Sequence, residues 1–366
     1  MGRIMNTLFG GETRSSLSVS ATAPFMITNG VANPNKLVSA STALKNSDLY
    51  AVTSLISADI AGSHFKGASP LIGMLNKPNK DVSRYNFWQT MMLNLLLNGN
   101  ALAVIQRGEN DLPTGLIPVS SKDVTINQDD ESGEITYIVN GFNNAPSGVY
   151  KQSDIIHIRI MAYGDNYLDS LLGHSPLESL TNELQRGNVA NQLSTSIMKN
   201  ALAPTGLLKL PEAGKMSEET KDIVRQQFEK ANSGDNIGRT IILDETASFS
   251  TVSINSDIAK YLTQLDWGRT QIAKAYGVPD SYLNGQGDQQ SSLTMISALY
   301  VNGLNKYIEP MISELNAKLG GNIEFDMKAI TDYSGQQQLN NLIALVDKGI
   351  LGIDEAHSLL IDRGLI

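Results

Sequence analysis

The chain has 366 residues, of which 41% are hydrophobic and 18% charged, and its formal net charge is −9. This length accommodates two domains or one elongated subunit of an assembly, and the composition is that of an ordered soluble protein. The acidic balance argues against tight, sequence-blind binding of nucleic acid through a basic face, while brief contact with DNA stays open.

Several kinds of site and location are excluded by what the sequence lacks. There is no cysteine, so disulfides, thiolate nucleophiles and cysteine-based zinc sites are ruled out. The opening MGRIMNTLFGG holds too short an apolar run for a signal peptide, and Asn6 breaks the myristoylation pattern. The most apolar window, residues 91–105, is too short to cross a bilayer. We therefore expect a soluble intracellular protein with no membrane partner.

Helical patterns begin after residue 45. Residues 1–45 are rich in Ser, Thr, Ala and Asn without clear periodicity, so we expect a flexible arm or a loosely packed edge. Apolar residues at helical spacing predict a helix over residues 49–65, with Ser47 or Asp48 as its cap. A second helix is predicted to open at Ser83 and to stop at Gly99.

Strand patterns occupy residues 100–160. We predict strands in ALAVIQR, LIPVSSKDVTINQ, ITYIV and DIIHIRI, and a hairpin turn at DDESGE. A calcium loop at this turn fails, because its first and twelfth ligands would be Gln128 and Val139.

A long helix with uncharged polar faces is predicted over residues 175–200. Ser175 is its cap, Pro176 its first residue, and Glu178 completes a capping box. The apolar stripe of this helix consists of Leu177, Leu180, Leu184, Leu193 and Ile197. Asn, Gln, Ser and Thr fill the other faces, which suits helices that lie against copies of themselves, or a merely polar surface.

A compact insertion follows between Pro204 and Ile254. Its pattern predicts strand TGLLKL, a helix over residues 217–231, and strands RTIIL and SFSTVSI. Ser217 is the expected cap of the helix, and the acidic residues after it favour its positive end.

Two further helices flank a chemically mild loop. The first covers residues 256–276 and ends before Gly277. The second reaches residue 319 and contains Pro310, which removes one backbone donor and is expected to bend it. The loop between them carries Asn, Gly, Gln, Asp and Ser but no basic cluster. A short strand, IEFDM, and helical pieces close the chain.

The sequence assembles no convincing catalytic, metal or cofactor site. Its four histidines are far apart, and His157 is expected to be structural. Ser196 and Lys199 have the spacing of some acyl-transfer enzymes but lack the companion motifs. The GQG at residues 285–287 is too short for a dinucleotide fingerprint. We therefore expect a subunit of an assembly without a cofactor, a metal or an enzymatic activity.

The order of these segments resembles the portal proteins of tailed bacteriophages, of the shorter siphovirus and prophage type. The resemblance rests on LYAVTSLISADIA, LNKPNKDVSRYNFWQTMMLNLLLNGNALAVI, DIIHIR, GHSPLESL, ALAPTGLL and IAKAYGVPDSYLNG, in this order. It implies an α+β subunit with an α/β wing, long stem helices, a small α/β clip and a bent helix behind a tunnel loop. It also implies a ring of identical subunits, usually twelve, that passes double-stranded DNA during packaging and ejection.

The resemblance implies a division of the chain, a location and a set of partners. The expected parts are an N-terminal arm (1–45), wing (46–174), stem helix (175–200), clip (201–255), second stem helix (256–283), tunnel loop (284–292), wing or tunnel helix (293–319) and short crown (320–366). The ring would lie at one capsid vertex of the virion, after assembly in the host cytoplasm. Its partners would be the terminase large subunit, the head–tail adaptor, the major capsid protein and scaffolding proteins.

Two sets of residues are expected to touch these partners. The tunnel loop facing DNA would consist of Asn284, Gly285, Gln286, Gly287, Asp288, Gln289, Gln290, Ser291 and Ser292. The clip contacts to terminase and adaptor would be Glu218, Glu219, Lys221, Asp222, Arg225 and Glu229. Because each Lys or Arg contact to phosphate would act as a brake, a mild loop suits moving DNA. A plain linker and a plain solvated helix are the alternatives for the two sets.

Two other functions stay open at this point. One is an intracellular hydrolase whose site is assembled from scattered residues such as His157, Arg159 and Asp165. The other is a ring-forming connector that never contacts DNA.

Overall fold

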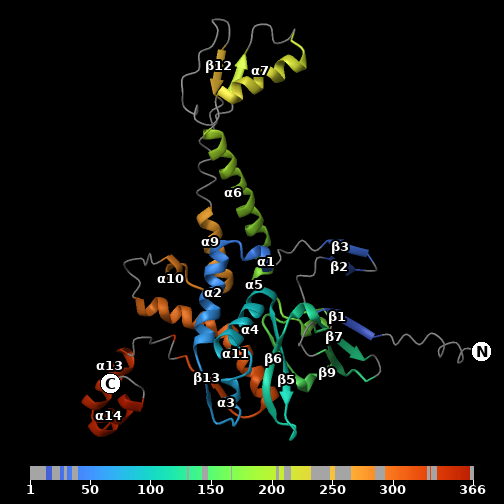
Figure 1. Cartoon of the computed structure of the whole chain (residues 1–366). Helices are drawn as coiled ribbons and strands as arrows, with labels where there is room; N and C mark the ends of the chain where they lie inside the picture. Colours follow the sequence, from blue (N-terminus) through green and yellow to red (C-terminus); the bar gives the residue numbers. More distant parts are fainter. Residues whose placement is uncertain are drawn as a thin grey trace, which may run out of the picture. The chain divides into compact units, whose positions relative to one another are not determined.

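The structure of the chain is a computed structural model, and it describes residues 14–18, 25–28, 31–34, 40–129, 132–141, 147–165, 167–202, 206–209, 216–231, 248–251, 265–284, 293–327, 330 and 336–362. The chain divides into two compact units, one made of residues 1–181 and 269–366 and the other of residues 182–268. Helices and antiparallel strands build the first unit (Figure 1), so the predicted α+β class is confirmed.

A three-stranded antiparallel sheet lies at the centre of the first unit. Its order is β10-β5-β6, with β5 at Asn100–Arg107, β6 at Pro113–Val119 and β10 at Ile155–Arg159. The first six residues of β5 are all buried, which is the pattern of a strand covered on both faces.

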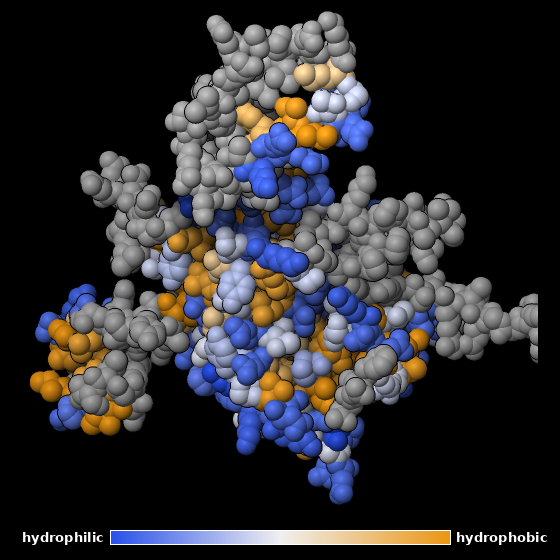
Figure 2. Space-filling view, turned by 45° about the horizontal axis from the view of Figure 1, so that its top comes forward, coloured by the Kyte–Doolittle hydropathy of each residue, from blue (hydrophilic) through white to orange (hydrophobic). Residues whose placement is uncertain are grey.

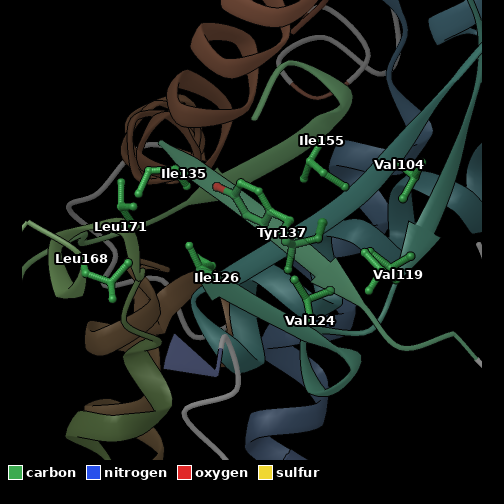
Figure 3. Close-up of a cluster of buried hydrophobic side chains, with 11 residues drawn as sticks. Val104, Val119, Val124, Ile126, Ile135, Tyr137, Ile155, Leu168 and Leu171 are labelled. Carbon is green, nitrogen blue, oxygen red and sulfur yellow. The ribbon is translucent and has the colours of Figure 1, made fainter. Parts of the chain in front are cut away.

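A second sheet shares its core with the first. Its order is β1-β7-β8-β9, with β1 at Arg14–Ser18, β7 at Val124–Asp129, β8 at Ile135–Val139 and β9 at Gly148–Lys151. Alternate residues of β8 are buried, and its Tyr137 lies among aliphatic side chains of both sheets (Figure 3). The predicted hairpin between β7 and β8 is confirmed by their pairing, whereas β1 and β9 were not predicted.

Helices pack on the central sheet. Helix α2 (Ser47–Gly62) packs on α4 (Arg84–Asn98), and α4 packs on β5. Ser83 caps α4 and Gly99 ends it with a φ of 73°, as predicted. The cap of α2 is Asn46, whose side chain accepts from the Leu49 N–H at 2.9 Å, so the expected Ser47 or Asp48 cap is wrong by one or two residues.

A small two-stranded sheet connects the segment after helix α11 (Leu293–Leu319) with α4. Strand β4 (Phe65–Gly67) pairs with β13 (Ile323–Phe325), which lies in the segment expected to begin the crown. Phe65 packs against Trp88, and the Trp88 indole N–H donates to the Leu75 carbonyl at 3.0 Å. These contacts place Ile323 and Phe325 in the core of the first unit, while Glu324 between them is exposed.

The helix expected over residues 175–200 is two helices. Helix α5 covers Pro176–Ser179 and α6 covers Thr181–Leu202. Leu180 between them has φ −97° and ψ 4°, outside the helical range, although the predicted Ser175–Glu178 capping box is present. The break was missed because the apolar spacing continues through it.

The second unit contains α6 from residue 182 onward and a small α/β element. Strand β11 (Gly206–Lys209) pairs antiparallel with β12 (Ser248–Thr251), and helix α7 covers Glu218–Ala231. The predicted strand RTIIL lies outside the described residues. Residues 256–264 of the predicted second stem helix also lie outside them, and the described helix α9 is Leu265–Tyr276.

The remaining elements follow in chain order. They are β2 (Phe25–Thr28), β3 (Val31–Pro34), α1 (Ala40–Ala43), α3 (Ile72–Leu75), η1 (Ser121–Asp123), η2 (Gln152–Asp154), η3 (Asp169–Leu171), α10 (Asp280–Asn284), α11 (Leu293–Leu319), α13 (Gln336–Asp347) and α14 (Ile353–Asp362). Part of the segment expected as an arm thus forms strands, β1 to β3.

Candidate functional site

The loop expected to face DNA begins where α10 ends. Asn284 is the last residue of α10, and residues 285–292 lie outside the described residues. The helices on either side, α10 and α11, are described. Four tyrosines connect them with α9, α4 and α2, and we call Tyr276, Tyr282, Tyr300 and Tyr307 the tyrosine cluster.

Tyr300 joins α11 to both α10 and α2. Its ring stacks on Tyr282, with centroids 4.4 Å apart and planes 14° from parallel. Its hydroxyl donates to Asp59 Oδ2 at 2.6 Å. Burial raises the pKa of Asp59, while the hydrogen bond from Tyr300 opposes that rise. Burial and the adjacent carboxylate raise the pKa of Tyr300, so this hydroxyl stays a neutral donor.

The end of α9 is joined to α11 by backbone contact and by hydrogen bonds. The Tyr307 hydroxyl donates to the Tyr276 carbonyl at 3.0 Å, and the Tyr276 hydroxyl donates to Leu96 O at 3.2 Å. A Cβ on Gly303 would lie 2.1 Å from the Gly277 carbonyl oxygen. Only glycine at position 303 therefore allows α11 to approach the turn after α9 this closely.

Lys306 caps the end of α9. Its Nζ donates to the Ala275 carbonyl at 3.1 Å and lies 5.0 Å from the Tyr307 ring centroid. A cation is favourable at the carboxyl end of a helix. Loss of hydration nevertheless lowers the pKa of Lys306 to about 8. Pro310, four residues further inside α11, has no N–H to donate to the Lys306 carbonyl.

A buried polar network joins strands β5, β8 and β10 to the segment just before α5. Asn100 Oδ1 accepts from the Gly173 N–H at 2.9 Å and contacts His157 Nε2 at 3.0 Å. The Tyr137 hydroxyl contacts His157 Nδ1 at 3.1 Å. Because an amide oxygen only accepts, Nε2 of His157 carries a proton that it donates to Asn100 Oδ1. Burial lowers the pKa of His157 well below its ordinary value, and nearby Arg159 lowers it further.

Helix α7, which was expected to be the clip helix, is described within its own unit. Ser217 accepts from the Thr220 N–H at 3.2 Å, which confirms the predicted cap. Two ion pairs line the exposed surface: Glu218 with Lys221 at 2.7 Å, and Asp222 with Arg225 at 2.6 Å.

Among the other clip candidates, Glu219 is exposed, and only the backbone of Glu229 is described. Ile223, on the same helix, is 51% exposed. An exposed apolar residue beside paired charges is compatible with a docking surface and equally with a solvated helix.

Sequence reasoning singled out neither Asp59 nor the tyrosine cluster as a unit. Asp59 and Tyr300 are separated by 241 residues, so no local spacing links them. The capping box and the glycine after α9 were the available local signals, and both are present in the structure.

The hydrolase alternative gains no support from the described geometry. His157 is buried and fully engaged with Asn100 and Tyr137, out of reach of a substrate. Asp165, the acidic residue of that alternative, accepts a hydrogen bond from the Tyr163 hydroxyl at 3.3 Å and not from His157.

Two kinds of feature are absent from the residues that the structure describes. Within these ranges, no group of three or more His, Cys, Asp or Glu side chains is arranged to hold a metal. Likewise, none of the described helices combines the length and the apolar character needed to span a membrane.

Comparison with known proteins decides the family. The family model described as phage portal protein matches residues 47–360. The chain belongs to the phage portal protein family. A probable portal protein of Streptomyces phage phiC31 is 25% identical over 368 residues, covering 90% of this chain and 77% of that protein. The portal resemblance predicted from the sequence is thereby confirmed.

Solved structures show the same fold at low identity. An HK97-family phage portal protein from Corynebacterium diphtheriae matches with a TM-score of 0.58 and 14% identity, covering 85% of this chain and 98% of that one. A second match is a chain in the neck of a native gene transfer agent particle, a neck computed with C12 symmetry. Its TM-score is 0.60 and its identity 19%, and the match covers 87% of this chain and 91% of that one. The α+β portal fold of this chain is therefore shared with both.

Proposed function

We propose that twelve copies of this chain form a closed ring at one capsid vertex and that double-stranded DNA passes through its centre during packaging and ejection. The observation that carries the proposal is the family match over residues 47–360, supported by the C12 neck to which the fold is similar. The ring would belong to the virion and would assemble in the host cytoplasm. No catalytic step is assigned to it.

Helix α6 supports the ring proposal. Val189 is 58% exposed and Leu193 is 36% exposed, although Leu193 was expected in the apolar stripe. Asn188, Asn191 and Gln192 beside them are exposed and uncharged. Around a cyclic axis each subunit presents one face to a different face of its neighbour. An apolar pair framed by amides suits such a contact, as the predicted stem helix requires.

The ring is tested by negative-stain imaging and native mass spectrometry of the purified protein. We expect a closed ring of about a dozen subunits with a central hole. A stable monomer or dimer at high protein concentration would overturn the channel proposal. A ring that forms but neither packages nor ejects DNA would favour the connector that never contacts DNA.

We assign the tunnel loop to residues 284–292 and the clip docking surface to α7, as parts of the same proposal. The helices beside the loop are held by the tyrosine cluster and by Asp59, which gives the loop fixed ends. The clip would dock the terminase large subunit and then the head–tail adaptor, while the rest of the ring would contact capsid and scaffolding proteins.

Charge reversal tests the clip assignment. We expect the double variant Glu218→Lys/Glu219→Lys to assemble normally and to lose terminase binding at least about tenfold, because rim charges steer association. Glu109→Lys/Asp123→Lys, at exposed positions of the wing, is the control with the same charge change. Equal terminase binding by both variants, measured by surface plasmon resonance, would refute the docking role.

A further inference from the structure

The C-terminal hairpin of α13 and α14 carries an apolar stripe on each helix. Leu339, Leu342, Ile343 and Val346 follow helical spacing on α13, and Ile353, Ala356 and Leu360 do so on α14. The turn between the helices is closed by hydrogen bonds from the Gly349 N–H to Val346 O and from the Ile350 N–H to Leu345 O, both at 2.9 Å. Gly349 has a φ of +67°, which suits glycine after a helix end.

The two stripes line a groove of about 240 Å³, with Asp347 and His357 at its sides. Leu342 and Ala356 form its buried floor. Ile343 is 50% exposed and Ile353 is 75% exposed, so its apolar walls face water. Figure 2 shows apolar side chains at the surface of this segment, at the left of the view.

No other described element packs extensively on this groove. Within the part of the chain that the structure describes, the extensive contacts of α13 and α14 are with each other. Two helices bury only the faces that they turn to one another, and a stable domain needs a further layer on the remaining apolar face. A hairpin of this size is also too small to be stable through its own core. The groove therefore has the shape and the apolar surface of a helix-binding site.

Charge indicates which kind of helix fits. Residues 336–362 contain Asp347, Asp354, Glu355 and Asp362 against one base, Lys348, a net charge of −3 with His357 neutral. A second copy of the hairpin would bring the same negative charge to the contact, and DNA would be repelled. A helix with Lys or Arg beside its apolar stripe would be attracted.

We propose that the α13–α14 groove binds an amphipathic, basic helix of another protein. About three turns of that helix would fit, since α13 has 12 residues and α14 has 10, each rising 1.5 Å per residue. Apolar side chains of the ligand at i, i+3, i+4 and i+7 would cover Ile343 and Ile353. This inference is independent of the DNA channel.

The test uses the full-length protein and a fluorescein-labelled synthetic peptide. The peptide has about four turns, with leucines at i, i+3, i+4 and i+7 and lysines at the other positions. Its control is a scrambled peptide of identical composition and charge. We expect saturable binding of the patterned peptide by fluorescence anisotropy, at least about tenfold tighter than that of the scrambled one, because only the former gathers its apolar side chains on one face.

Matched variants locate the site. We expect Ile353→Asp and Ile343→Asp each to weaken peptide binding at least about tenfold, because they place a charge in the apolar groove. Ile350→Asp is the control, since Ile350 is 69% exposed but lies in the turn outside the groove. Circular dichroism and native mass spectrometry check that each variant keeps its fold and assembly state.

Three results would overturn the proposal. The first is equal binding of patterned and scrambled peptides, which would show attraction by charge alone. The second is an equal loss in Ile350→Asp and Ile353→Asp. The third is a groove variant that changes the mass of the assembly while the wild-type protein ignores the peptide, which would make the groove a contact between copies of this chain.

Discussion

At the scale of single residues, His157 couples stability to pH. Its pKa is lowered in the folded chain because it is buried beside Asn100, Tyr137 and Arg159. Below about pH 6.5 the unfolded chain binds a proton there that the folded chain refuses, so stability falls as pH falls. We expect His157 to lower the free energy of unfolding by about 1 kcal/mol between pH 6.5 and 5.5. His157→Gln should lack this part of the pH dependence.

The measurement is urea unfolding followed by tryptophan fluorescence at both pH values and one protein concentration. Subtracting the free energy of unfolding of His157→Gln from that of the wild type cancels groups that titrate in both proteins. One such group is His174, where burial lowers the pKa but hydrogen bonds to Glu178 and to Tyr163 O outweigh it and raise the pKa overall. Identical pH dependence of the two proteins would contradict the assignment to His157.

Tyr300 makes a second prediction at this scale. Tyr300→Phe removes the donor 2.6 Å from Asp59 Oδ2 and leaves a partly buried carboxylate without it. We expect the free energy of unfolding to fall by about 1–3 kcal/mol. Tyr163→Phe, at a hydroxyl on a side chain that is 70% exposed, is the control and should change it by less than about 0.5 kcal/mol. Denaturant unfolding that ranks the two variants equally would argue against a structural role for the Asp59–Tyr300 contact.

At the scale of elements, α6 is the helix on which the ring proposal can be tested. Val189→Asp/Leu193→Asp places two charges at the exposed apolar pair, and we expect native mass spectra to shift from rings to smaller species. Leu112→Asp/Val149→Asp is the control, because these residues are 63% and 68% exposed in the first unit. Rings in both variants at equal yield would remove α6 from the interface.

Elements also differ in how well they could be predicted. The caps Ser83, Ser175 and Ser217 were found because a cap is a local pattern of a few residues. The break at Leu180 was missed, since apolar spacing alone continues through one non-helical residue. Strand β1 was missed because its partner β7 lies more than a hundred residues away, and Ser-rich strands give little periodic signal.

At the scale of the whole molecule, net charge and the proposed loop govern how DNA would move. Asp288→Lys would add a basic group to each subunit of the proposed ring, and each phosphate contact releases counterions. We expect DNA packaging to slow by roughly an order of magnitude, with recovery as salt is raised. Asp288→Asn is the control that removes the charge without adding a base. Packaging rates that are equal for the two variants would count against contact between this loop and DNA.

The sequence by itself determined the properties that are written in order along the chain. Helix starts such as Ser83, the capping box at Ser175, the β7–β8 hairpin and the order of family segments all arise from neighbouring residues. That order was sufficient to predict the portal family, which the match over residues 47–360 confirms.

Only the tertiary structure decided which distant residues meet. The Asp59–Tyr300 hydrogen bond joins residues 241 positions apart, and the Asn100–His157 contact joins residues 57 positions apart. The close approach of Gly303 to Gly277 likewise appears only once α11 is packed. Such contacts depend on how helices and strands pack in three dimensions, because no local periodicity in the chain records which side chains face one another across a core.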